Sequence, residues 1–346
     1  MKQAFPEIVG NDALKRHLAD DVMERTLSHA YIFEGPAGIG KHTLALHLSA
    51  ALACENRDNA SMPRPCMQCP ACRKVLEGKS PDITTIGRDG KATIGVETIR
   101  ALREDVHVLP NDLEYKVYII EDMHTMTVQA QNAFLLTLEE PPAFVLFLLL
   151  CENSRALLET IRSRAPVLPL RPVPTRDMED YLCRTEPRAA QLRATSAREW
   201  RELLLCANGS IGRARTLLDA KARAPLLARR RWADDFVRIC LDSRDRAGRA
   251  ITAIGQAGKT REELNETLLT LETALRDLLA LKKEENTPLL FYTDREDALH
   301  LSDSFSATAL LRLWDATEET RLAIFVRNAN IRLSLVRFVS EAGMLP

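Results

Sequence analysis

The sequence has no run of roughly 18 apolar residues, which excludes an α-helical membrane span. Its longest apolar stretch, residues 143–151, has only the length of a buried strand. The first residues lack the apolar core of a secretory signal peptide. A formal net charge of −1 excludes a chain that binds nucleic acid through overall charge. We therefore expect a cytoplasmic protein whose cysteines remain reduced.

The length of 346 residues is enough for two or three domains. Up to about residue 170, short apolar segments alternate with segments of helical periodicity, which predicts an α/β domain with a mainly parallel sheet. Three prolines within residues 168–174 indicate a boundary, and the leucine spacing beyond it predicts helices. Residues 171–231 carry 14 Lys and Arg against 7 Asp and Glu, which is typical of either a solvated helical face or a surface for nucleic acid or an acidic partner.

A nucleotide-binding P-loop pattern lies near the beginning of the chain. The pattern G-x-x-x-x-G-K is complete, with its defining residues at Gly35, Gly40 and Lys41. A strand expected over residues 30–34 precedes the loop, and a helix expected over residues 41–53 follows it. Because strand, loop and helix come in the order that the motif requires, the pattern predicts a phosphate-binding loop.

The position after the P-loop lysine does not fit an active ATPase. Ser or Thr belongs there because its hydroxyl ligates Mg²⁺, but the residue is His42. Thr43 comes one residue late, and a helix rotates by about 100° per residue, so its side chain should point away from the metal. The loop glycines, Gly38 among them, and the lysine can still hold phosphate. We therefore expect ATP and Mg²⁺ to bind weakly or not at all.

An acidic pair follows a second expected strand, residues 115–120. A P-loop ATPase uses an Asp to hold Mg²⁺ and often a following Glu to position water. The order here is Glu121 and then Asp122. An Asp in place of the Glu is about 1.5 Å short, and a misplacement of that size can reduce a rate about a hundredfold. The pair is either a degenerate catalytic site or a solvated strand end.

Four of the eight cysteines lie close together in the sequence, at Cys54, Cys66, Cys69 and Cys72. Overlapping C-x-x-C pairs with a fourth cysteine are typical of a tetrahedral zinc site, and four thiolates leave no open position, so the zinc would be structural. A redox dithiol and four unrelated thiols are the alternatives. The remaining cysteines are scattered and read as core or incidental residues: Cys151, Cys183, Cys206 and Cys240.

Three strings in the sequence resemble one protein family. Residues 131–142, Q-N-A-F-L-L-T-L-E-E-P-P, resemble the N-A-L-L-K-T-L-E-E-P-P signature of bacterial clamp-loader subunits, which are AAA+ proteins of the DNA polymerase III holoenzyme. Phe and Leu stand where that family usually has Leu and Lys. Residues 161–165 are similar to the family's S-R-C motif, with Ala165 in place of Cys. Residues 328–333, N-A-N-I-R-L, resemble the N-A-N-x-x-L string of the family's collar helix.

The resemblance implies a three-domain organisation. It consists of an AAA+ P-loop domain over residues 1–170, a helical lid domain over 171–222 and an all-α collar domain over 223–346. The expected zinc module, residues 54–72, is inserted between the P-loop helix and the next strand, as in that family.

Two classes of subunit in the family share these features. His42 and the order of the acidic pair favour the delta-prime class, whose P-loop is often degenerate, over the gamma/tau class, whose P-loop is intact. In gamma/tau subunits an Arg follows Gly-Ser-Leu on the lid, whereas Arg213 comes one place late here. The implied degenerate nucleotide site comprises Gly35, Gly38, Gly40, Lys41, Glu121, Asp122 and Arg213.

The resemblance implies a structural stator rather than an enzyme in its own right. The chain would join gamma/tau and delta subunits in a hetero-oligomer that loads the sliding clamp onto primed DNA, as part of a DNA-directed DNA polymerase complex. Arg164 would be catalytic in trans, as an arginine finger in a neighbouring subunit's ATP site, where such a group can increase the rate about 10³–10⁵-fold. A local salt bridge of Arg164 is the alternative, and Arg162 is the alternative finger.

Two other functions remain compatible with the sequence. The first is an active clamp-loader ATPase of the gamma/tau type, which the isolated chain would reveal by hydrolysing nucleotide. The second is a zinc-containing nucleic-acid-binding protein with a vestigial P-loop, which would bind DNA tightly as a monomer.

Overall fold

The computed structural model describes residues 4–57, 59, 62–88, 90–241, 245–258 and 260–343. The chain divides into two compact units. The first comprises Met1–Tyr181 with Gly209–Arg213, and the second comprises Leu182–Asn208 with Ala214–Pro346. Each unit has hydrophobic core of its own.

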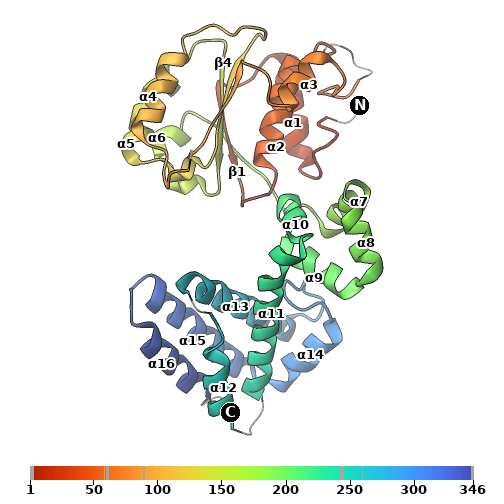
Figure 1. The fold of residues 1–346 in the computed structure, drawn as a ribbon, viewed down its shortest axis with the longest axis vertical. Coiled ribbons are helices and arrows are strands. Elements are labelled where there is room, and N and C mark those ends of the chain that lie inside the picture. The colour runs from red at the N-terminus through yellow and green to blue at the C-terminus, as the bar shows by residue number, and fades with distance from the viewer. Residues whose placement is uncertain are drawn as a thin grey trace. The chain divides into compact units, whose positions relative to one another are not determined.

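A sheet of five parallel strands lies at the centre of the first unit (Figure 1). The strands are β1 (Ala30–Glu34), β2 (Ile83–Ile86), β3 (Lys116–Ile120), β4 (Val145–Cys151) and β5 (Val167–Pro169). Their order across the sheet is β2-β3-β4-β1-β5, with Ala30 opposite Phe147 and Ile120 opposite Leu149. Every residue of β3 and β4 is buried, because a strand in the middle of a parallel sheet is covered on both faces.

Helices cover both faces of this sheet (Figure 1). The helical elements are α1 (Asp12–Glu24), α2 (Lys41–Ala53), α3 (Pro70–Leu76), α4 (Val96–Asp105), η1 (Met123–Thr125), α5 (Val128–Glu139), η2 (Ser154–Ala156) and α6 (Glu159–Arg162). On one face, Leu44 and Leu48 of α2 share a core with Phe33 of β1. On the other, the ring of Phe134 in α5 meets that of Phe147 edge to face, with centroids 5.2 Å apart. Two apolar faces thus hold the sheet between two helical layers.

The second unit is helical. Its helices are α8 (Pro187–Thr195), α9 (Ala197–Ala207), α11 (Ala220–Leu241), α12 (Arg246–Ile254), α13 (Arg261–Lys283), α14 (Arg295–Ser304), α15 (Ala307–Phe325) and α16 (Ile331–Gly343), while α7 (Thr175–Thr185) and α10 (Ile211–Leu217) contain residues of both units. The expected leucine stripe lies on α13, whose Leu268, Leu271 and Leu275 are fully buried against neighbouring helices. Among the described helices, none is both long and apolar enough to cross a membrane.

The predicted α/β fold with a mainly parallel sheet, followed by helical segments, is confirmed. The predicted division into three domains stays a prediction. At the expected boundary between residues 222 and 223, α11 runs on as one continuous helix.

Candidate functional site

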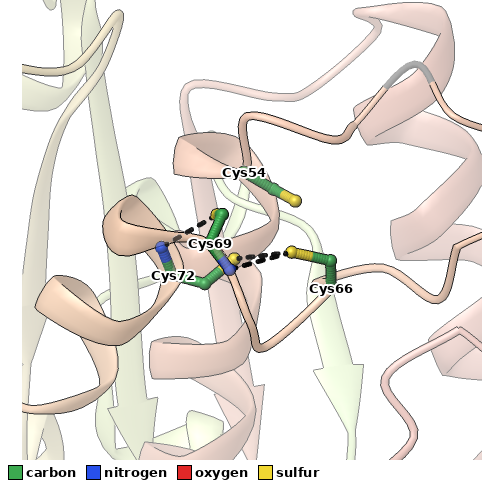
Figure 2. A group of neighbouring side chains, drawn as sticks. All are labelled: Cys54, Cys66, Cys69 and Cys72. Carbon is green, nitrogen blue, oxygen red and sulfur yellow. Dashed lines mark hydrogen bonds between the residues drawn. The ribbon is translucent and has the colours of Figure 1, made fainter.

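Four buried cysteines lie together at the carboxyl end of α2 (Figure 2). Cys54 directly follows α2, and Cys69 is the N-cap residue of α3. Cys66 lies in the loop before α3, and Cys72 lies in the first turn of that helix. The end of one helix and the beginning of the next therefore bring all four predicted metal ligands to one place.

The spacing of the sulfur atoms fits a tetrahedral metal. All four Sγ atoms lie within 4.8 Å of one another, and the Sγ atoms of Cys66 and Cys72 are 3.9 Å apart. Zn–S bonds of about 2.3 Å in a tetrahedron place the sulfurs about 3.8 Å apart. The backbone N–H of Cys69 donates to Cys66 Sγ, and that of Cys72 to Cys69 Sγ, each at 3.4 Å. The cluster has the ligand set and the geometry to hold a metal, consistent with zinc.

The surroundings of the cluster affect its thiols unequally. Burial opposes ionisation of Cys66, but hydrogen bonds from Asn56 and from backbone N–H groups outweigh it and lower the pKa of this thiol to about 6. Burial raises the pKa of Cys72, and the side chain of Cys69 raises it further. One thiol is therefore ready to bind a cation as thiolate, while a bound metal would displace the protons of Cys54 and Cys72, whose pKa values burial raises.

Replacing Cys69 by Ser removes one of the four ligands. We expect the Cys69→Ser protein to lose zinc, measured as metal per chain by mass spectrometry, and to melt several degrees lower, because binding of a structural metal contributes to folding. The matched control is Cys183→Ser, which changes a half-buried thiol outside the cluster. Full zinc content in the Cys69→Ser protein would contradict the assignment.

The P-loop follows β1, and Gly40 is the N-cap residue of α2. The side chain of Lys41 folds back onto this loop, where Nζ donates to the carbonyl oxygens of Gly35 at 2.6 Å and Pro36 at 3.0 Å. Burial lowers the pKa of Lys41, although the negative charge of Asp122 acts in the opposite direction. The ammonium group that would hold phosphate is therefore engaged by the loop itself.

The acidic pair lies at the same edge of the sheet as the P-loop, because it follows the parallel strand β3. His42 Nε2 lies 3.7 Å from Glu121 Oε1, and Arg88 Nε lies 3.0 Å from Asp122 Oδ2. Such half-exposed ion pairs contribute at most about 1 kcal/mol each to stability. What matters for the site is that both carboxylates already have a partner. The imidazole of His42 lies beside Glu121, and the guanidinium of Arg88 lies beside Asp122.

Residues 209–213 pack against the tip of the P-loop. The backbone N–H of Gly212 donates to Gly38 O at 3.1 Å, and Ser210 Oγ donates to Ala37 O at 3.3 Å. Gly38 has φ +71°, and a Cβ there would lie 2.8 Å from Ser210 Oγ. The loop and the segment over it are therefore in direct contact, with no room for a side chain between them.

The remaining predicted nucleotide-site residues differ in their surroundings. The backbone of Arg213 lies beside Gly38, but its side chain is exposed and makes no ion pair or hydrogen bond within the described part of the chain. Thr43 is exposed. The structure thus brings the seven residues of the predicted site to one edge of the sheet. There Lys41 bonds to its own loop, and the acidic pair is partnered by His42 and Arg88.

Gly209 determines how closely residues 209–213 approach Pro172 and Val173. Its φ is +72°, and a Cβ there would lie 2.5 Å from Pro172 Cβ and 2.8 Å from Val173 N. We expect Gly209→Ala to lower the free energy of unfolding by about 1–3 kcal/mol, measured by urea denaturation. Gly78→Ala is the matched control because Gly78 has φ +68° and open space around it. Equal losses in the two variants would show that the close contact is unimportant.

The predicted arginine finger, Arg164, forms a local salt bridge. Its NH2 lies 2.7 Å from Glu139 Oε1, and its NH1 donates to Thr160 O at 2.9 Å. Both charged side chains remain partly exposed, at 35% and 44%. The side chain of Arg162 is exposed and has no ion pair or hydrogen bond to any described residue. An exposed ion pair of this kind contributes little free energy, so Arg164 can leave Glu139 for a partner of higher charge.

A buried glutamine supports the segment that carries both arginines. Gln131 Nε2 donates to Met126 O at 3.1 Å, and Gln131 Oε1 accepts from the backbone N–H of Leu158 at 2.8 Å. Leu158 is the N-cap residue of α6, so this one side chain of α5 fixes where α6 begins. Gln131 is therefore a positioning residue for Arg162 and Arg164.

Sequence reasoning missed several partners in these sites. Arg88 and Glu139 pair with predicted residues, and Asn56 donates to Cys66 Sγ at 3.4 Å. Glu139 belongs to the 131–142 string, so the sequence offered its carboxylate as a possible partner for an arginine. Nothing in the sequence pointed to Arg88 or Asn56, because both lie in irregular segments.

Comparison with known proteins gives the following relatives. Residues 10–174 match the family model described as "DNA polymerase III, delta subunit". The chain is 36% identical over 162 residues to DNA polymerase III subunit tau of Bacillus subtilis, a match that covers 47% of this chain and 28% of that protein. It is 33% identical over 204 residues to subunit tau of Escherichia coli, covering 56% and 31%. The chain therefore spans less than a third of the length of these relatives.

Solved structures include two similar chains from Thermotoga maritima. A protein related to the DNA polymerase III gamma subunit has a TM-score of 0.44 and 17% identity, with 96% of this chain and 99% of that chain covered. The Holliday junction branch migration motor RuvB has a TM-score of 0.42 and 15% identity, covering 90% and 88%. The sequence matches are to subunits of DNA polymerase III, and their names differ in the subunit.

Proposed function

We propose that this chain, as a member of the DNA polymerase III clamp-loader family, is a subunit of the delta-prime type. In this role it is a zinc-bearing stator with little or no ATPase activity of its own. The observation that carries the proposal is the state of the P-loop, whose lysine binds its own loop, with Nζ 2.6 Å from Gly35 O. The metal-binding position after that lysine holds His42.

The acidic pair supports the same conclusion. A Mg²⁺ ion needs an unpaired carboxylate on the strand beside the P-loop. Asp122 instead has the guanidinium of Arg88 at 3.0 Å, and Glu121 has the imidazole of His42 at 3.7 Å. A cation beside Asp122 opposes the approach of a second cation, so the site is poorly suited to hold nucleotide with its metal.

The contact between the P-loop and residues 209–213 supports a rigid role. An ATPase subunit must rearrange this region when nucleotide enters and leaves. Here the Gly212–Gly38 and Ser210–Ala37 hydrogen bonds tie the tip of the P-loop to residues 209–213. A subunit that is held in this way provides a fixed surface for its neighbours.

The contribution to catalysis would be made in a neighbouring subunit. Arg164 lies next to a short helix at the surface and is partly exposed. Among the described residues, Glu139 alone pairs with its charge. A guanidinium has the planar shape and permanent charge that stabilise a transferring phosphoryl group. We propose that Arg164 leaves Glu139 and enters the ATP site of an adjacent gamma/tau subunit.

The proposed partners follow from this assignment. They are gamma/tau and delta subunits in a cytoplasmic hetero-oligomer, and through them the sliding clamp and primed DNA. The zinc cluster then has a structural role, since all four of its protein ligands are buried thiols.

A second candidate is an active ATPase of the gamma/tau type. It is favoured by the identity to tau subunits and by the complete G-x-x-x-x-G-K pattern at residues 35–41. Isolated chain that hydrolyses ATP steadily would favour this candidate over the stator.

The trans role of Arg164 predicts a loss of activity in the assembly. The assay mixes this chain with gamma/tau and delta subunits. Arg164→Ala should reduce turnover about 10³–10⁵-fold at the one ATP site that Arg164 enters. The total ATPase activity of the assembly then falls by the fraction that this site contributes. Glu139→Gln is the control because it removes the local partner and keeps the arginine. Arg162→Ala tests the alternative finger. With assembly verified by gel filtration, unchanged ATPase in Arg164→Ala would refute the role.

The degenerate metal site predicts that one substitution does not restore hydrolysis. We expect the isolated His42→Thr protein to remain at background ATPase activity, because the reversed acidic pair and Arg88 persist. Phosphate release over time measures this, with the wild-type chain as reference. Rapid turnover by His42→Thr would show that the acidic pair is competent.

A further inference from the structure

A cavity of about 420 Å³ lies within the helical second unit, among α9, α11 and residues 291–297. Its volume is in the range of small-molecule sites, about 300–1,000 Å³. The wall includes the aromatic residues Phe291 and Tyr292 and the aliphatic Leu227. Neither the P-loop nor the zinc cluster contributes to it, so its chemistry is separate from the functions described above.

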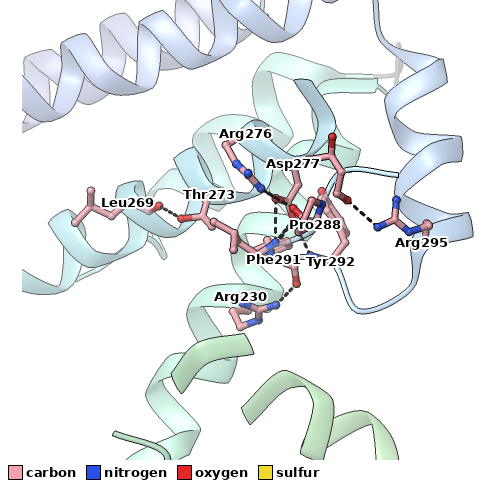
Figure 3. A network of polar contacts seen from close by, with 11 residues as sticks. Arg230, Leu269, Thr273, Arg276, Asp277, Pro288, Phe291, Tyr292 and Arg295 are labelled. Carbon is pink, nitrogen blue, oxygen red and sulfur yellow. Dashed lines mark hydrogen bonds and ion pairs between the residues drawn. The ribbon is translucent and has the colours of Figure 1, made fainter. Parts of the chain in front are cut away.

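The aromatic wall is held rigidly by a buried carboxylate (Figure 3). Asp277 of α13 is fully buried and accepts hydrogen bonds from the backbone N–H groups of Leu290, Phe291 and Tyr292, at 2.9, 2.7 and 3.2 Å. The guanidinium of Arg230 lies 4.4 Å from the centre of the Phe291 ring and donates to that residue's carbonyl oxygen. Contacts from two helices thus fix the wall before any ligand arrives.

Two buried polar atoms in residues of this wall have no partner among the described residues. The Tyr292 side chain is 7% exposed and its hydroxyl has no hydrogen bond, and Asp234 Oδ1 likewise has none. Burial raises the pKa of Tyr292, and the charge of Asp234 raises it further, so the hydroxyl remains a donor close to that carboxylate. An unpaired buried donor and an unpaired buried acceptor are each costly unless a ligand or water satisfies them.

The unpaired charge around the cavity is positive. Arg231 is exposed and has no ion pair or hydrogen bond to a described residue, and Arg201 donates only its Nε, to Ala197 O. The acidic residues of the lining are at least partly engaged. Glu202 pairs with Arg198, Asp297 and Asp234 Oδ2 pair with Arg238, and Asp294 is the N-cap of α14. Arg201 and Arg231 therefore retain donors for an anion.

We propose that this cavity binds one nucleotide residue, with its phosphate at Arg201 and Arg231 and a base edge at Asp234 and Tyr292. Each base offers a donor and an acceptor side by side, which matches the carboxylate oxygen and the hydroxyl. The apolar wall suits the faces of the base. The nucleotide is either free or part of a single strand, since both present the same groups.

The test is a titration of the full chain, followed by calorimetry, with deoxyadenosine monophosphate and separately with a short oligo(dA). Both are done in a Lys41→Ala background, so that the P-loop does not contribute. We expect at least one ligand to bind, and Arg231→Ala and Tyr292→Phe each to weaken it about tenfold, as expected for loss of one charged or buried hydrogen bond. Arg229→Ala is the matched control: it removes an adjacent arginine that pairs with Glu266 at 4.0 Å and lies outside the cavity.

The two ligands distinguish the sources of the nucleotide. Binding of the mononucleotide indicates a free nucleotide, and binding of oligo(dA) alone indicates a strand. Failure of both to bind overturns the proposal, as does binding that neither Arg231→Ala nor Tyr292→Phe weakens. Circular dichroism of each variant shows that a loss of binding is not a loss of fold. These outcomes are independent of whether Arg164 acts in a neighbouring subunit.

Discussion

Parallel pairing of β1 and β3 with β4 is the constraint on which the first unit depends. Because all three strands run the same way, the P-loop after β1 and the acidic pair after β3 leave the sheet at one edge. His42 and Glu121, 79 positions apart in the sequence, consequently come within 3.7 Å. The buried side chains of β3 and β4 hold this register, since a shift of one residue would move each of them into packing shaped for a different side chain.

At that edge, the polar groups around the P-loop form hydrogen bonds and ion pairs with other groups of the protein. The P-loop lysine bonds to loop carbonyls, an arginine pairs with the second acidic residue, and the segment over the loop bonds to its tip. These are the groups that a working ATPase keeps available for phosphate and metal. Their mutual engagement is the physical basis of the structural role that we propose, in which the chemistry would lie with the exposed arginine side chains on α6 and beside it.

In the second unit, a buried charge is likewise paired with groups of the protein itself. Asp277 has no solvent exposure, yet three backbone donors satisfy it and so set the path of the chain that follows. The same network places Phe291 and Tyr292 in the wall of a cavity. A carboxylate that organises a loop thus also shapes a surface with unsatisfied hydrogen-bonding groups.

The sequence by itself determined the parallel α/β sheet, the helical remainder, the P-loop with its wrong residue and the four-cysteine cluster. These follow from local signals: strand and helix periodicity, and residue types at short fixed spacing. Only the tertiary structure decided which residues form hydrogen bonds and ion pairs with one another. Glu139 lies 25 residues from Arg164, and Gly212 is 174 positions from Gly38, so no local pattern connects them. Such contacts arise when separately specified elements pack together, because hydrogen bonds and ion pairs depend on distance in space and not along the chain.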